Sequence, residues 1–315
     1  MSDGKLFRLS NGSVQELVSS SMAVEKSLQS LIEDHLDTFL GVRMLASEYP
    51  TGKNHGGRID TLGIDENGGP VIIEYKRALN ENVINQGLFY LDWLLDHRGE
   101  FERLVMKRID LQTADDIDWS APRLLCIAGD FTRYDEHATK QINRSIELIR
   151  YRRYGEEFLF LELVNANPPA SGGDTGPKKK GADKPTVVEK PLPGKTAEKT
   201  IGERLAQAAV EVQDRYAALD AFLVALGGDV QTKALQNYFA YRRLKNFACV
   251  EVHPTLKRIS VYVKVDPDTV ALEPGFTRDV RKVGHFGTGD LEVTILTDED
   301  MERAKPLLLR SYETS

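Results

Sequence analysis

Apolar residues follow two different spacings in the first half of the chain. Over residues 23–40 they recur every three or four positions, which predicts an amphipathic helix. Strands are predicted where short apolar runs stand between turn residues: residues 42–50, both sides of the DENGG turn at 65–69, residues 122–130 and residues 156–164. Further helices are predicted at residues 80–95 and 135–151. One sheet flanked by helices is the economical packing for this mixture.

A change in composition divides the chain into two domains. Residues 165–200 are rich in Pro, Gly and Lys and have almost no large apolar side chains, so they cannot bury enough surface to offset chain entropy. They are predicted to be a flexible linker between a domain at residues 1–164 and a separate, small α+β domain at residues 201–315. The second domain is predicted to hold one long helix or two, a short helix, a hairpin, a third strand and a closing helix. These lie at residues 201–227, 233–243, 247–265, 290–297 and 298–312.

The bulk composition limits the class of protein. A hydrophobic fraction of 41% and a charged fraction of 28% are those of a globular protein. The net charge of -7 argues against a protein that coats nucleic acid by bulk charge, although it is compatible with a local basic groove. Cys126 and Cys249 stand in apolar runs, as buried free thiols of a reducing compartment do. With no secretory signal and no membrane-spanning run, a cytoplasmic protein without a membrane partner is expected.

The segment PVIIEYK, residues 70–76, places charges inside an apolar strand. Because side chains alternate between the faces of a strand, Glu74 and Lys76 share one face. A hairpin loop of three residues at 66–68 would bring Asp60 of the preceding strand directly opposite Glu74. A loop of two residues would slip the register by one and turn Asp60 to the other face.

Two neighbouring carboxylates in an apolar strand repel each other unless a cation lies between them. Hard oxygen ligands suit Mg²⁺ or Mn²⁺, and such an ion would activate a water and clamp a phosphate. The ammonium of Lys76 could then hold the attacking water or stabilise charge on the phosphoryl oxygens. The alternative is a salt bridge between Glu74 and Lys76, with Asp60 as a turn residue. An acid-x-Lys triplet alone is weak evidence, because it recurs by chance.

The motif GGRID...VIIEYKR...QGLFY resembles the PD-(D/E)XK nuclease superfamily, and it looks most similar to the nuclease domain of NucS-type and related RecB-like endonucleases. The resemblance covers residues 21–105 well. It implies an α/β, restriction-endonuclease-like core with a mixed central sheet flanked by helices. It also implies metal-dependent hydrolysis of DNA phosphodiester bonds, in repair or in defence against foreign DNA. The chain departs from the superfamily pattern at Ile59, where a Pro is common.

The resemblance assigns roles residue by residue. The catalytic residues that it implies are Asp60, Glu74, Lys76, Gln86 and Tyr90. The implied ligands of Mg²⁺ or Mn²⁺ are Asp60, Glu74, the backbone carbonyl of Tyr75 and an acid of the first helix. Glu25 is chosen for that acid because it opens the apolar stripe of the helix, and Glu33 is the competitor.

DNA is the expected partner, with single-stranded and branched forms among the candidates. The residues expected to contact its phosphates are Lys53, His55, Arg58 and Arg77. Solvated loop side chains are an equally good explanation for these four, because loops are usually polar. A homodimer is expected by analogy with nucleases that cut two strands.

The C-terminal domain, from about Ala217, resembles a domain of unknown function that is appended to such nucleases and is sometimes labelled a predicted transport protein. His285, within KVGHFGTGDLEV, is the feature associated with that domain, and it is equally compatible with a turn histidine that makes a structural hydrogen bond. The role of this C-terminal domain is expected to be substrate recognition or regulation. The alternative to a nuclease is a nucleic-acid-binding or regulatory protein that has the nuclease fold without catalysis.

Overall fold

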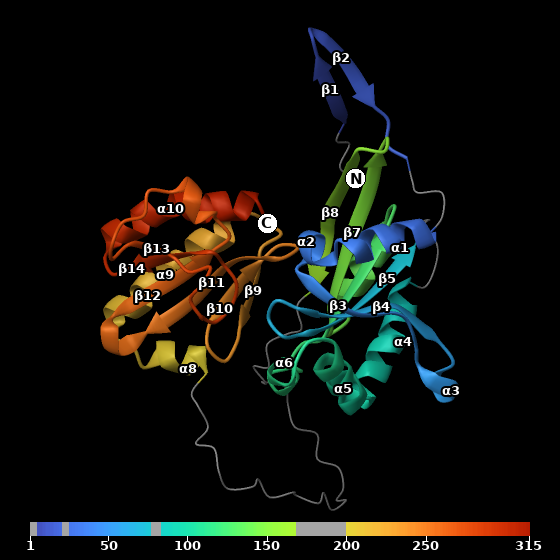
Figure 1. Cartoon of the computed structure of the whole chain (residues 1–315), viewed down its shortest axis with the longest axis horizontal. Helices are drawn as coiled ribbons and strands as arrows, with labels where there is room; N and C mark the ends of the chain where they lie inside the picture. Colours follow the sequence, from blue (N-terminus) through green and yellow to red (C-terminus); the bar gives the residue numbers. More distant parts are fainter. Residues whose placement is uncertain (1–4, 21–24, 77–82, 168–199) are drawn as a thin grey trace, which may run out of the picture.

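The computed structural model describes residues 5–20, 25–76, 83–167 and 200–315 (Figure 1). Two six-stranded sheets, each with its own helices, make up the body of the molecule. One sheet is built from the first half of the chain and the other from the second half. The residues predicted to form the linker lie mostly in 168–199, outside the described residues, so the linker stays a prediction.

The N-terminal sheet has the strand order β3-β4-β5-β6-β7-β8. Its parallel pairs are β5 with β6 and β6 with β7, and the remaining pairs are antiparallel. This is the mixed central sheet that the sequence predicts. Its strands are β3 (Val42–Pro50), β4 (Arg58–Asp65), β5 (Pro70–Lys76), β6 (Arg123–Ala128), β7 (Ser145–Tyr154) and β8 (Phe158–Asn167).

Helices cover both faces of this sheet and bury an apolar layer on each. The helices are α1 (Glu25–Asp34), α2 (Leu36–Leu40), α3 (Gly52–His55), α4 (Val83–Asp96), α5 (Arg98–Arg108), α6 (Leu111–Asp115) and α7 (Arg133–Lys140). Leu28 and Ile32 of α1 pack with Ile73 of β5 on one face. Leu91 of α4 packs with Ile72 on the other face. β5 therefore lies in the middle of the fold, which makes its charged residues costly unless they serve a site.

The helix predicted at residues 135–151 is wrong in its second half. A helix is present only as α7, and residues from Ser145 onward form β7. β7 is an interior strand of the sheet, and Ile146, Leu148 and Ile149 are fully buried on its two faces. A strand buried on both faces has no strict alternation, so its apolar spacing resembles that of a helix.

The C-terminal sheet has the strand order β13-β14-β12-β11-β10-β9, and every neighbouring pair is antiparallel. Helices α8 (Ile201–Ala206), α9 (Val210–Ala225) and α10 (Asp298–Glu313) share an apolar core with one face of it, as expected for an α+β unit. The short helix predicted at 233–243 is absent, since β9 and β10 form a hairpin there. The strands are β9 (Gln231–Ala234), β10 (Phe239–Arg242), β11 (Asn246–His253), β12 (Arg258–Val263), β13 (Thr277–Asp279) and β14 (Leu291–Ile295).

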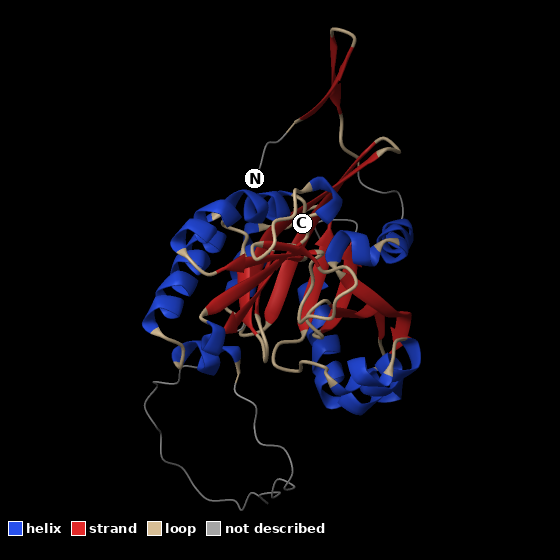
Figure 2. Ribbon diagram, turned by 60° about the vertical axis from the view of Figure 1, so that its left-hand side comes forward, coloured by secondary structure: helices blue, strands red, loops and turns tan. Residues whose placement is uncertain are grey.

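A separate hairpin of β1 (Leu6–Ser10) and β2 (Ser13–Leu17) stands apart from the body in both views (Figures 1 and 2). Its strands turn at Asn11 and Gly12, both in the left-handed region that this pair of residues favours in hairpin turns. None of the helices in the described ranges has the length and apolar character needed to cross a bilayer.

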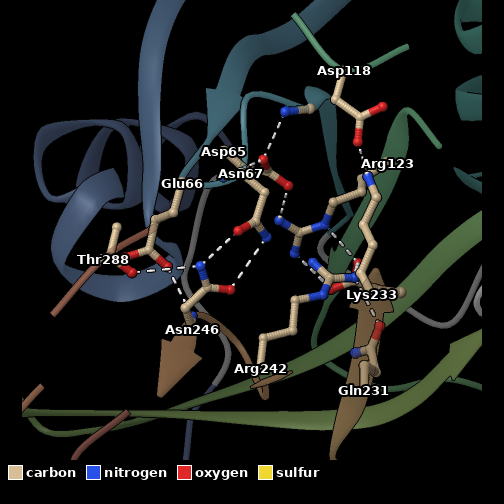
Figure 3. A network of polar contacts seen from close by, with 12 residues as sticks. Asp65, Glu66, Asn67, Asp118, Arg123, Gln231, Lys233, Arg242, Asn246 and Thr288 are labelled. Carbon is tan, nitrogen blue, oxygen red and sulfur yellow. Dashed lines mark hydrogen bonds and ion pairs between the residues drawn. The ribbon is translucent and has the colours of Figure 1, made fainter. Parts of the chain in front are cut away.

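The two halves of the chain meet at the turn of the β4–β5 hairpin (Figure 3). Arg123 of β6 donates to Asp65 at 3.0 Å and to both carboxylate oxygens of Glu147 at 2.8 and 2.9 Å. Arg242 of β10 donates to the same Glu147 at 2.7 Å. Burial disfavours ionisation of Glu147, but the charges of Arg123 and Arg242 outweigh it and lower its pKa to about 2.

Polar contacts of the turn itself complete this interface. The backbone N–H of Asn246 donates to Glu66 at 2.8 Å, and its side-chain amide donates to Asn67 at 2.8 Å. Tyr238 donates to Asn67 at 3.0 Å, and Lys264 forms an ion pair with Glu66. The C-terminal half thus binds the turn that joins the two strands carrying Asp60 and Glu74.

Candidate metal centre and active site

The β4–β5 hairpin has the register predicted from a three-residue loop. The N–H of Asp65 donates to the carbonyl of Gly69 at 2.9 Å, and Thr61 pairs with Ile73. One residue pair further from the turn, Asp60 lies opposite Glu74. The alternative two-residue loop, which would separate these carboxylates, is excluded.

Asp60 and Glu74 each accept a hydrogen bond from the backbone of the opposite strand. The N–H of Tyr75 donates to Oδ2 of Asp60 at 3.1 Å, and the N–H of Asp60 donates to Oε1 of Glu74 at 3.2 Å. These two bonds hold both carboxyl groups between the strands. The second oxygen of Glu74, Oε2, is buried and has no hydrogen-bond partner, so it is an acceptor available to a ligand.

The electrostatics of the pair are unfavourable without a cation. Burial, followed by the charge of Asp60, raises the pKa of Glu74 from 4.5 to about 9. Burial also raises the pKa of Asp60, although the N–H of Tyr75 and the charge of Lys76 act against this rise. A divalent cation would favour the ionised form of both groups. The uncompensated pair and the free oxygen of Glu74 therefore fit a hard cation such as Mg²⁺ or Mn²⁺.

Few protein side chains beside Asp60 and Glu74 are arranged as ligands of a metal ion within the described residues. Within the described ranges, no group of three or more His, Cys, Asp or Glu side chains is arranged to hold a metal ion. Asp60 and Glu74 are two donors, and Glu25, a backbone carbonyl and water would have to supply the remainder. That donor set suits Mg²⁺, which keeps several waters when it is bound by one or two carboxylates.

Lys76 lies at the end of β5 and forms its ion pair with Glu25 of α1. Its Nζ atom is 3.4 Å from Oε1 of Glu25, and both side chains are partly exposed. The structure therefore does not support the simple Glu74–Lys76 salt bridge. The charges of both Lys76 and Glu25 act on Asp60 and on Glu74, so the four side chains lie near one another, and we call this group the candidate pocket.

Glu33, the competitor of Glu25, faces a different environment. Its Oε1 atom accepts from Thr61 at 2.5 Å and from Gln29 at 3.0 Å. The Thr61 hydroxyl oxygen is also 3.2 Å from the hydroxyl of Tyr75, which packs on the α1 side of the sheet. Glu33 thus completes a hydrogen-bond network beneath α1, and this geometry favours Glu25 as the helix acid of the pocket.

Gln86 and Tyr90 lie one turn apart on α4 and contact each other. Nε2 of Gln86 donates to the hydroxyl of Tyr90 at 3.3 Å, and the same hydroxyl accepts from the backbone N–H of Arg58 at 3.1 Å. The Tyr90 ring is buried against Gly57, where a Cβ atom would come within 2.6 Å of it. Tyr90 therefore ties α4 to the start of β4, two residues before Asp60.

The expected DNA contacts are placed less uniformly. Lys53 is exposed on α3, and Arg58 is exposed while paired with Glu48. His55 packs its ring against Phe89, with 5.1 Å between the centroids. Arg77 lies outside the described residues, so its assignment stays a prediction.

Two residues at the pocket escaped the sequence analysis. Gln29 is buried on α1, and its side-chain amide donates to the carbonyl of Asp60 at 2.9 Å. Glu48 of β3 lies opposite Asp60 in register, with a positive φ of 53°. Its hydrogen bond with Lys26 is the largest cause of its lowered pKa. A non-glycine residue with a strained backbone beside a site suggests a functional role, and no sequence pattern predicts such strain.

His285 lies in the other half of the molecule and does not join this pocket. Its ring stacks on Tyr262, with 4.2 Å between centroids and 7° between planes. One ring nitrogen is 3.3 Å from the carbonyl oxygen of Phe286. These contacts are those of a structural loop histidine.

Three comparisons relate the chain to known proteins. A family model described as a domain of unknown function, DUF5655, matches residues 201–315. An uncharacterised protein of Haemophilus influenzae is 25% identical over 312 residues, covering 98% of this chain and 99% of that protein. The match along nearly the full length of both proteins indicates that the two halves occur together in that relative.

Two solved structures also resemble part of the chain. A repair endonuclease from Pyrococcus abyssi is 17% identical with a TM-score of 0.28, covering 44% of this chain and 51% of that one. EndoMS, in a complex with double-stranded DNA, is 17% identical with a TM-score of 0.24, covering 42% of this chain and 47% of that one. The chain thus spans about half the length of these structures, and the interpretation of the pocket rests on its own geometry.

Proposed function

We propose that the protein is a metal-dependent endonuclease that hydrolyses phosphodiester bonds of DNA, in repair or in defence against foreign DNA. One observation carries this proposal: Asp60 and Glu74 are held side by side by backbone N–H groups, and Oε2 of Glu74 is left without a partner. DNA is proposed as the substrate because the residues around the pair resemble the PD-(D/E)XK motif.

Four groups of this pocket would hold Mg²⁺ or Mn²⁺. Asp60 and Glu74 offer carboxylate oxygens, the backbone carbonyl of Tyr75 offers a third, and Glu25 reaches the pocket from α1. When bound, the ion would supply an activated water and neutralise charge on the scissile phosphate. The backbone N–H donors to Asp60 and Glu74 would keep the two carboxylates oriented without a metal, which lowers the cost of assembling the site.

Lys76 would orient the attacking water and stabilise the negative charge that builds on the phosphate. Its ion pair with Glu25 leaves the ammonium partly exposed at the end of β5. Gln86 and Tyr90 would act by positioning, because the Tyr90 hydroxyl fixes the backbone at Arg58. Lys53, His55, Arg58 and Arg77 would contact the DNA backbone.

The test is cleavage of single-stranded, branched and duplex DNA with Mg²⁺ or Mn²⁺. Glu74→Gln is expected to abolish cleavage, because it removes a metal ligand without changing the size of the side chain. Lys76→Ala is expected to reduce the rate by about 100- to 1,000-fold. The matched controls are Glu211→Gln and Lys257→Ala, which alter an exposed Glu–Lys pair of the C-terminal half and should leave the rate unchanged. Cleavage that survives Glu74→Gln contradicts the proposal.

The alternative is a nucleic-acid-binding protein that has this fold without catalysis. A calorimetric titration with Mn²⁺ separates the two, because a binding protein does not need the ion. Binding of Mn²⁺ that Glu74→Gln removes supports the nuclease, and DNA binding without any Mn²⁺ binding supports the alternative.

A further inference from the structure

One face of the C-terminal sheet is polar, whereas its opposite face forms the apolar core with the helices. Side chains alternate between the two faces of each strand, and Val252 of β11, Ile259 of β12 and Val293 of β14 belong to that core. The residues beside them in the three strands therefore point to the other face, and they are Glu251, His253, Arg258, Ser260, Glu292 and Thr294. Part of this polar face is nevertheless buried, since Ser260 is 0% and Glu292 is 3% exposed.

Three buried side-chain atoms on the polar face have no hydrogen-bond partner within the described ranges. They are Nε2 of His253, Nε of Arg258 and Oγ of Ser260. His253 and Arg258 are directly opposite each other on β11 and β12, and Ser260 follows Arg258 two residues later. Nε2 of His253 is 3.4 Å from Oε2 of Glu251 without making a hydrogen bond to it. A buried polar group without a partner is costly, so three of them together indicate a ligand.

All three atoms can donate a hydrogen bond, which favours an anion as that ligand. The guanidinium of Arg258 is a permanent donor with a positive charge, and the Ser260 hydroxyl can rotate toward an acceptor. Burial lowers the pKa of His253, and the neutral ring donates in the tautomer that carries its proton on Nε2. A guanidinium recognises phosphate and carboxylate groups with paired, charge-assisted hydrogen bonds.

The two acids of this face are compensated by other groups. Glu292 accepts a hydrogen bond from Nε of Arg278 at 2.8 Å. Glu251 accepts from the backbone N–H of Phe286 at 3.2 Å, and burial raises its pKa, which favours the uncharged carboxyl group. An anion bound at Arg258 is therefore opposed only weakly by its acidic neighbours.

A cavity beside Arg258 offers room for the remainder of a ligand. It measures about 410 Å³ and is lined by residues of β12, β13 and β14 and of the segments next to them. Arg258 and Thr294 line it from the polar face, and Phe276 and Leu296 give it apolar walls. A volume of this size is within the range of small-molecule sites.

We propose that this face binds a small organic anion. Its phosphate or carboxylate group is held by Arg258, Ser260 and His253, and its apolar portion lies in the cavity beside Phe276. A small molecule is the occupant because the unpaired donors are buried and the adjoining cavity has a limited volume. β11 begins at Asn246, which contacts the β4–β5 turn, and ends at His253, so this anion site lies at the end of β11 away from that contact.

Calorimetric titration of the metal-free full chain with phenyl phosphate, benzoate and benzyl alcohol tests this inference. The three probes share an aromatic ring and differ in charge. The two anions are expected to bind and benzyl alcohol is not, and the tighter anion identifies the preferred group. Arg258→Gln should weaken binding by at least about tenfold, because it removes the permanent charge. Arg310→Gln, at an exposed arginine of α10, is the matched control and should bind as wild type does.

Ser260→Ala separates a ligand site from a structural role. Because Oγ of Ser260 has no partner, its removal should not lower the free energy of unfolding. Binding of the preferred anion should nevertheless weaken, because the anion loses a donor. Urea unfolding and the same titration measure these two quantities, and circular dichroism verifies that Arg258→Gln is folded.

Four results would overturn the inference. Neither anion binding at millimolar concentration would exclude the site, and benzyl alcohol binding as tightly as the anions would exclude recognition of charge. Unchanged binding by Ser260→Ala, or equal weakening by Arg258→Gln and Arg310→Gln, would place the ligand elsewhere. Displacement of phenyl phosphate by a single-stranded oligonucleotide would assign this face to a nucleic acid instead. None of these results depends on whether the protein cleaves DNA.

Discussion

At the residue scale, the pocket is defined by one carboxyl group that is buried among apolar side chains and has no contact with water. Glu74 is fully buried in a strand whose preceding side chains are apolar, and only one of its oxygens has a partner. Such a group is costly to the fold when it is ionised. Its presence in the centre of the sheet is best explained by a ligand that recovers this cost on binding.

The raised pKa of Glu74 predicts how the metal-free protein responds to pH. The unfolded chain releases this proton near pH 4.5, but the folded chain keeps it until about pH 9. Between these values the folded state binds more protons, so the free energy of unfolding should fall as pH rises, by at most about 1.4 kcal/mol per pH unit. Urea unfolding of metal-free protein from pH 5 to pH 9 measures this slope. Glu74→Gln should flatten it, and an unchanged slope would contradict the assigned pKa.

Mn²⁺ should stabilise the protein more at high pH than at low pH. Binding requires the ionised carboxylates, so each bound ion must displace the proton of Glu74. The rise in melting temperature on adding Mn²⁺ is therefore expected to grow from pH 6 to pH 8. Glu211→Gln should show the same rise as wild type, and a rise equal at both pH values would argue that Glu74 is not a ligand.

At the element scale, β4 is aligned by side chains of two helices on opposite faces of the sheet. Gln29 of α1 holds the carbonyl of Asp60, and Tyr90 of α4 holds the N–H of Arg58. Both contacts act on the same short segment of backbone. The position of Asp60 thus depends on helices that carry no metal ligand at these positions.

Tyr90→Phe removes the hydroxyl that accepts from Arg58 while keeping the buried ring. The free energy of unfolding should fall by about 1 kcal/mol, the usual effect of losing one hydrogen bond. Cleavage should slow because Asp60 is less well fixed, and Mn²⁺ affinity should fall with it. Tyr134→Phe, at an exposed tyrosine of α7, is the control for the loss of a phenol hydroxyl. A rate loss without any change in Mn²⁺ affinity would indicate that Tyr90 acts on the DNA side instead.

How much the sequence could predict depended on the surroundings of each element. The β4–β5 hairpin was predictable from the DENGG turn, and the structure selects the three-residue loop from the two that the sequence allowed. β7 was not, because a strand buried on both faces has no clear period, and its Glu147 and Arg150 are neutralised by partners distant in sequence. Glu48 was missed because its alignment with Asp60 arises from a third strand.

At the scale of the whole molecule, a buried group of three charges joins the two halves. Glu147 lies between Arg123 of its own sheet and Arg242 of the C-terminal half, and all three are buried. Burial and the nearby charge of Arg123 lower the pKa of Arg242, and the charge of Glu147 acts against this fall. The contact is therefore strong only while its central acid is ionised.

Glu147→Gln should destabilise the protein more than Arg242→Gln does. Without Glu147, Arg242 loses the acid that it pairs with and Arg123 keeps only Asp65, and breaking such a buried pair costs about 3–5 kcal/mol. Without Arg242, Glu147 keeps its two bonds with Arg123. Chemical unfolding at pH 7 measures both values, and the reverse order would contradict the assigned role of Glu147.

In wild type, the lowered pKa of Glu147 makes its contribution to the free energy of unfolding complete above pH 4.5. This contribution is lost as pH falls toward 2.

Because the C-terminal half docks on the turn at Asp65, it lies at a fixed distance from Asp60. Five residues of β4 separate that turn from Asp60, and an extended strand rises about 3.4 Å per residue, or about 17 Å in all. The other end of this segment is held by Gln29 and Tyr90, so the C-terminal half and the carboxylate pair cannot approach each other without breaking one of these contacts.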